Sequence, residues 1–163
     1  ATPLAPRTGA VAGLVTIPPA VGFWSPLPAL LLGVTAGVAS LFAIRMKGWF
    51  KYDDSLDVVA VHYVGGVIGT LFIGLFAAAA VNPAVKDQGV LLGGGLTQLG
   101  RQGLGVLAAT AFAFTATYAI ARVLRATIGL RVEPDEESEG LDTSQHAETA
   151  YEFTSTSGMG RVS

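Results

Sequence analysis

The stretch YDDSLDVVAVHYVGG, residues 52–66, decides how the chain folds. Three acids lie among its first six residues, and an apolar run with a single histidine, His62, follows them. The run continues through TLFIGLFA (70–77), so His62 lies inside a segment that approaches the roughly 20 apolar residues a transmembrane helix needs. An ionisable side chain at that depth is costly and usually marks an ion or proton path. The stretch therefore predicts a membrane-spanning helix and makes His62 a candidate functional residue.

The composition is typical of a membrane protein. Hydrophobic residues make up 51% of the 163 positions, and only ten basic and twelve acidic residues are present. The absence of cysteine from the sequence excludes a disulfide framework and a thiolate metal site. The basic residues form no cluster of the kind that binds nucleic acid. We predict an all-α polytopic membrane protein that needs no cofactor or metal and does not bind nucleic acid.

Gaps between charged residues divide the chain into apolar segments followed by a tail. The prolines of IPPAVGFWSPLP, residues 17–28, separate the first segment from the second. The predicted membrane segments cover about 8–17, 27–45, 54–80 and 102–125, and the tail covers 133–163. Ten helical residues reach only about 15 Å. Because the first segment is too short to cross, we expect the missing half of its helix to lie upstream of Ala1.

Basic residues near the segment ends predict the orientation, because cytoplasmic loops carry the excess of Lys and Arg. If the segments alternate in direction, the basic residues of one side are Arg7, Arg45, Lys47, Lys51, Arg122, Arg125 and Arg131, and those of the other are Lys86 and Arg101. The first side, which also holds the C-terminus, is therefore expected to be cytoplasmic. Trp24 is expected at the outer membrane interface and Trp49 at the inner one.

The acids before His62 suit the start of a helix. Asp53 or Asp54 can cap the N-terminus of the segment and face the positive end of its dipole. We name Asp54 and Asp57 as structural caps. Asp57 lies five residues before His62, about 140° around a helix, so one metal ion would not reach both side chains.

Small residues at four-residue spacing can let membrane helices approach closely. Two such pairs occur here, Gly33 with Gly37 and Gly65 with Gly69. A chain with 21 glycines produces such spacings by chance as well.

His62 allows two interpretations. It can be a structural histidine that bonds to a carbonyl of a neighbouring helix, or a functional group that faces a pore. Val58, four residues earlier, shares its helix face, so the imidazole lies along an otherwise aliphatic stripe. A neutral imidazole can accept a proton at one nitrogen and donate from the other. The intramembrane position favours the functional interpretation.

The pattern D-V-x-x-V-H followed by V-G-G, together with G-L-D-x-x-x-H-x-E-x-A-Y in the tail, closely resembles the ammonium transporter (Amt/Mep/Rh) family. The likeness extends over nearly the whole chain, from TGAVAGLVTIPPAVG to the end of the tail motif. It implies the last helices and cytoplasmic tail of an eleven-helix transporter, which is not an enzyme.

The resemblance also implies roles for single residues. His62 matches the second of the family's paired pore histidines, Val58 a pore-lining aliphatic residue on its cytoplasmic side, and Thr8 a small hydroxyl residue near the inner exit. Ammonium would be deprotonated, ammonia would cross the dry pore, and the proton would pass through the histidine pair. Tyr63 departs from the pattern, since many relatives have glycine there, and we expect it to pack between helices.

The tail has an acidic stretch, EPDEESE, that we expect to be flexible. Asp142 with Gln145 resembles a capping box before a short helix near 143–152. Gly140, Asp142, His146 and Tyr151 match a tail motif that, in the family, docks on the trimer and couples its subunits. The implied partners are ammonium or ammonia, the other copies of a homotrimer and a regulatory protein of the nitrogen-control type. An ammonium sensor that signals through this tail is the alternative, and a membrane scaffold with a structural His62 is a third interpretation.

Overall fold

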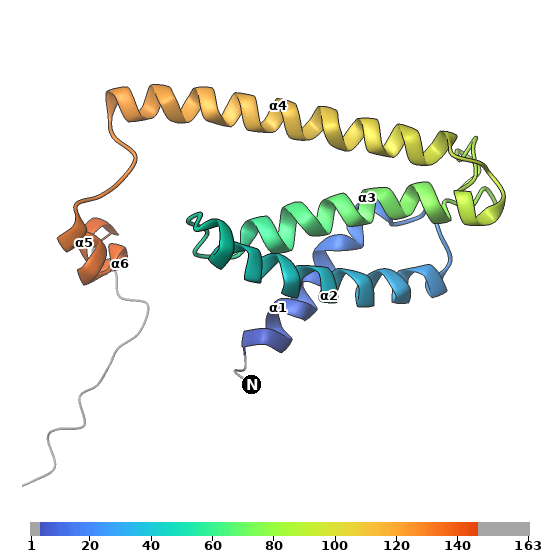
Figure 1. Ribbon diagram of the computed structural model, residues 1–163, viewed down its shortest axis with the longest axis horizontal. Helices are drawn as coiled ribbons and strands as arrows, with labels where there is room; N and C mark the ends of the chain where they lie inside the picture. Colours follow the sequence, from blue (N-terminus) through green and yellow to red (C-terminus); the bar gives the residue numbers. More distant parts are fainter. Residues whose placement is uncertain (1–3, 147–163) are drawn as a thin grey trace, which may run out of the picture. The chain divides into compact units, whose positions relative to one another are not determined.

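The computed structural model describes residues 4–146, with side chains from Gly9 onward (Figure 1). Its elements are α1 (Leu4–Thr16), η1 (Pro18–Ala20), α2 (Pro26–Phe50), η2 (Val59–Tyr63), α3 (Val64–Phe76), η3 (Val90–Leu92), α4 (Thr97–Thr127), α5 (Pro134–Glu139) and α6 (Leu141–His146). No strand occurs within residues 4–146. The predicted all-α fold class is confirmed.

Within the described residues, three helices are long and apolar enough to cross a membrane. They are α2, the continuous helix Val59–Phe76 formed by η2 and α3, and α4. Residues Gly9–Ala20 form a shorter apolar helix. Proline sets the start of α2, which follows the extended residue Ser25. The helix ends where Lys51 takes a left-handed conformation and donates its N–H to the carbonyl of Lys47.

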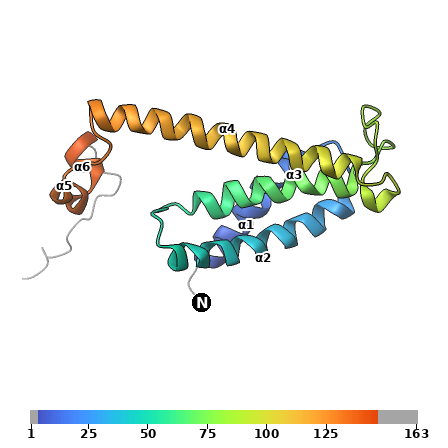
Figure 2. The same ribbon diagram turned by 45° about the horizontal axis from the view of Figure 1, so that its top comes forward.

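The described chain forms two compact units, one ending at Ala113 and the next beginning at Phe114, so that α4 belongs to both. In the first unit α2 and α3 run side by side (Figures 1 and 2). Helix α1 contacts both of them. This three-helix packing carries the candidate site.

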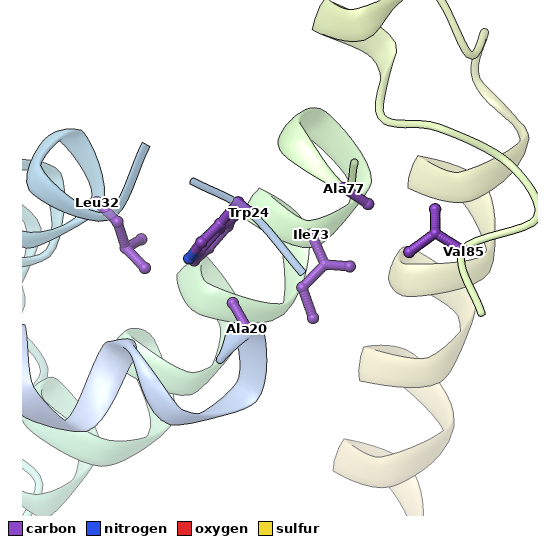
Figure 3. Close-up of a cluster of buried hydrophobic side chains, with 6 residues drawn as sticks. All are labelled: Ala20, Trp24, Leu32, Ile73, Ala77 and Val85. Carbon is purple, nitrogen blue, oxygen red and sulfur yellow. The ribbon is translucent and has the colours of Figure 1, made fainter. Parts of the chain in front are cut away.

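An apolar cluster fills one end of this packing (Figure 3). Its buried members are Ala20, Trp24, Leu32, Ile73, Ala77 and Val85. The Trp24 ring makes edge-to-face contacts with Phe72 and Phe76, with centroids 6.1 and 6.5 Å away. Only 8% of Trp24 is exposed. The expectation that Trp24 anchors the outer interface is therefore wrong: two phenylalanines of α3 hold the indole inside the protein.

Glycine brings α1 close to both of its neighbours. A Cβ on Gly69 would lie 2.2 Å from the backbone oxygen of Thr16, and one on Gly65 would lie 2.8 Å from the Thr16 hydroxyl. A Cβ on Gly13 of α1 would lie 3.9 Å from the Cα of Gly33, an ordinary contact. The close approach expected at the Gly65–Gly69 pair is present, and the contact with α1 there requires a residue without a side chain.

The second unit contains two short helices, α5 and α6. Three acids occupy the first turn of α5, where the helix dipole favours them, and Arg131 holds Glu137 with Nη2 3.0 Å from Oε2. The acidic stretch that we expected to be flexible is thus helical. The capping box is not formed, because Asp142 lies inside the first turn of α6 and Gln145 donates to Glu136.

Candidate functional site

The backbone around His62 departs from α-helical hydrogen bonding. Residues Val59–Tyr63 form a π-helical segment, η2, in which the N–H of Val64 donates to the carbonyl of Val59, five residues back. In an α-helix the acceptor would be Ala60. Single π-turns inside α-helices often occur at functional sites. Here the turn contains His62, the predicted pore histidine.

A side chain from α2 reaches this segment. The hydroxyl of Ser40 donates to the carbonyl of Ala60 over 3.2 Å. Ser40 has no exposed surface and Ala60 is 1% exposed. The carbonyl of Ala60, which the N–H of Val64 leaves without its α-helical donor, therefore accepts a hydrogen bond from a neighbouring helix. Buried backbone groups generally need such a partner.

The loop before η2 holds the start of the helix. Both carboxylate oxygens of Asp54 accept backbone N–H groups, from Val58 and Val59, at 2.9 Å each. Asp57 has a left-handed backbone and its carboxylate pairs with Lys47 of α2, with Nζ 2.6 Å from Oδ1. Lys47 also donates to the backbone oxygen of Asp54 at 2.9 Å. Asp54 therefore acts as the cap in this structure, and Asp57 instead links the loop to α2.

His62 and Val58 lie exposed in this chain, next to Tyr63. Val58 keeps 47% of its surface exposed, and no hydrogen bond to the His62 ring occurs within the described residues. The Tyr63 hydroxyl lies 3.4 Å from the Thr110 hydroxyl of α4. The carbonyl partner that the structural interpretation of His62 requires is not among residues 4–146.

The other predicted residues lie elsewhere in the chain. Thr8 belongs to α1, but its side chain is outside the described part. Gly140 ends α5 with a φ of 99°, which favours glycine, and Asp142 and His146 lie exposed on α6. Tyr151 lies outside the described residues. No group of three or more His, Cys, Asp or Glu side chains that could hold a metal ion occurs within the described part.

Sequence reasoning missed two residues of the site, Ser40 and Lys47. Ser40 lies on the buried stripe of α2, together with Leu32, Ala36 and Ala43. A hydroxyl on such a stripe signals a hydrogen bond to another element. The sequence pattern uses Lys47 only as one of the basic residues that predict the orientation. The acids that follow in the sequence could have indicated its ion pair.

The fold and its apolar helices define a multi-pass α-helical membrane protein. Residues 2–151 match the Ammonium Transporter Family, and the chain belongs to that family.

Known members of the family resemble this chain in sequence and in structure. The ammonium transporter of Mycobacterium bovis is 44% identical, over 97% of this chain and 34% of its own length. The crystal structure of Saccharomyces cerevisiae Mep2 superposes with a TM-score of 0.73 at 35% identity, covering 90% of this chain and 34% of Mep2. A structure titled Sensor Amt Protein has a TM-score of 0.74 at 32% identity, over 86% of this chain and 34% of that protein. The chain thus spans about a third of the length of the curated relatives it matches.

Proposed function

We propose that this chain is the C-terminal part of a homotrimeric ammonium transporter in the cell membrane, with a cytoplasmic C-terminus. Membership of the family supports ammonium or ammonia as the substrate. The tail motif G-L-D-x-x-x-H, which follows α4, supports the C-terminal placement through its resemblance to the family's cytoplasmic tail. The excess of basic residues on the side of the tail supports the orientation.

One observation carries the transport proposal: His62 lies exposed on the helix Val59–Phe76, which is long and apolar enough to span the membrane, and Val58 lies exposed directly before that helix. An imidazole in that position must face other protein or a cavity. In the proposed pore, His62 faces the path together with the aliphatic Val58, and Thr8 lies near its inner end.

The chemistry of these residues fits the separation of ammonia from its proton. An apolar path disfavours any cation, so ammonium must lose its proton before it crosses. The imidazole of His62 accepts a proton at one nitrogen and releases one from the other, which lets the proton cross separately. A potassium ion has no proton to lose and is excluded.

The test is the uptake of labelled methylammonium by the native membrane protein with His62→Ala. We expect uptake to fall to the level of membranes without the protein, because the proton loses its carrier. Tyr63→Phe is the matched control, since it changes the adjacent side chain but leaves the imidazole in place, and it should retain wild-type uptake. Wild-type uptake by His62→Ala, at an equal amount of protein in the membrane, would refute the proposal.

An ammonium sensor is the second candidate, favoured by the likeness to the structure titled Sensor Amt Protein. In this proposal the motif residues Gly140, Asp142, His146 and Tyr151 signal to a nitrogen-regulatory protein at the cytoplasmic face. Asp142 and His146 lie exposed on α6, where a partner can reach them. A pure sensor shows no methylammonium flux, and Asp142→Ala abolishes its signal. A transporter shows flux that depends on His62.

A further inference from the structure

The π-turn η2 is held at both of its ends. At its start, Asp54 accepts the N–H groups of Val58 and of Val59, the first residue of the turn. After the turn, Gly65 of α3 packs against the Thr16 side chain of α1, where a Cβ would come within 2.8 Å. A π-turn contains one residue more than an α-turn, so its conversion to an α-helix would rotate one end against the other by roughly 100°.

His62 lies inside this turn, so the direction of its ring depends on whether the turn persists. Such a turn leaves a carbonyl without its α-helical partner, which is costly in a buried place unless another donor supplies the bond. Ser40 supplies it here, 20 residues earlier in the chain and on another helix. Its hydroxyl is completely buried and makes its hydrogen bond to Ala60 rather than within α2.

We propose that Ser40 is a positioning residue for His62: by donating to the Ala60 carbonyl it stabilises the π-turn that sets the direction of the imidazole. Its effect on transport rests on the proposed function of His62, whereas its effect on the ring does not. The hydroxyl of Ser40 bonds to the Ala60 carbonyl and not to the imidazole. It acts through the backbone of η2.

Ser40→Ala removes the hydroxyl and leaves the packing volume almost unchanged. Ser40→Thr restores the donor, and Ser40→Cys keeps a side chain of similar size with only a weak donor. The matched control is Thr35→Ala on the same helix, because the Thr35 hydroxyl bonds to the carbonyl of Leu31 within α2 and lies exposed. All variants are made in the native membrane protein.

The primary readout is the ¹⁵N resonance pair of the His62 ring in protein labelled at histidine, assigned by its loss in His62→Ala. We expect Ser40→Ala to shift or broaden this pair and to lower methylammonium uptake roughly tenfold, the effect of losing one bond to a buried carbonyl. Ser40→Thr should restore both readouts. Thr35→Ala should change neither.

An unchanged His62 resonance pair in Ser40→Ala would overturn the proposal, whatever the uptake. If Ser40→Ala does not assemble, the same comparison is made with Ser40→Cys, and an unchanged pair there overturns it equally. Uptake that survives in His62→Ala refutes only the proposed function. The role of Ser40 is still decided by the His62 resonances of the Ser40 variants.

Discussion

Gly69 is the position where the packing of α1 on α3 leaves the least room, and we predict that Gly69→Ala destabilises the protein. A Cβ there would lie 2.2 Å from the backbone oxygen of Thr16, whereas ordinary contacts begin at 3.4 Å. The clash is with backbone, so no side-chain rotation can relieve it. Helices α1 and α3 would have to separate by about 1 Å.

The magnitude follows from two opposing terms. Forcing extra volume into a packed interior costs about 1–3 kcal/mol. Alanine in place of glycine inside a helix returns about 0.5–1 kcal/mol. The midpoints of the two ranges differ by about 1 kcal/mol, so we expect Gly69→Ala to lower the free energy of unfolding by about 1 kcal/mol.

The assay is a denaturant titration of the native protein in detergent micelles. Gly33→Ala is the matched control, because it lies inside α2 and its Cβ would meet no atom within 4 Å in this chain. The control should be as stable as wild type or slightly more stable. Equal stability of the two variants would show that the α1–α3 contact is not as close as we describe it.

Two further predictions concern the cap and the core. Asp54→Ala should lower the free energy of unfolding by about 1 kcal/mol, because two helix N–H groups lose their acceptor. The control Asp53→Ala should not change this free energy. An equal loss in both variants would contradict the assignment of Asp54 as the cap. Trp24→Ala should lower the free energy of unfolding by about 3–5 kcal/mol, as for other buried aromatic residues. Trp49 is 73% exposed, so Trp49→Ala should lower it far less in the same titration. The reverse order would refute the buried position of Trp24.

Much of the candidate site could be read from local sequence. The four-residue spacing of Val58 and His62 predicts one face of an α-helix, because that periodicity is a property of the helix alone. In the structure both residues are exposed, and the turn between them is π-helical. The acids before the run likewise indicated a helix cap, although the sequence left Asp53 and Asp54 as alternatives. Only the tertiary structure shows that both carboxylate oxygens of Asp54 accept the first N–H groups of the helix.

The parts that sequence could not predict involve partners distant along the chain. Ser40 and Ala60 are 20 residues apart and meet only because α2 packs against η2. Asp57 meets Lys47 for the same reason, ten residues away. Trp24 was expected at an interface because its sequence context resembles an aromatic anchor, and Phe72 and Phe76 place it in the core instead.

The sequence by itself determined the all-α membrane class, because long apolar runs interrupted by prolines and charged loops leave a chain in lipid few structures but helices. It also determined the family resemblance through the residues around His62. The tertiary structure alone decided how the backbone at His62 is bonded, because a π-turn needs a donor for its unused carbonyl. That donor, Ser40, comes from a different helix.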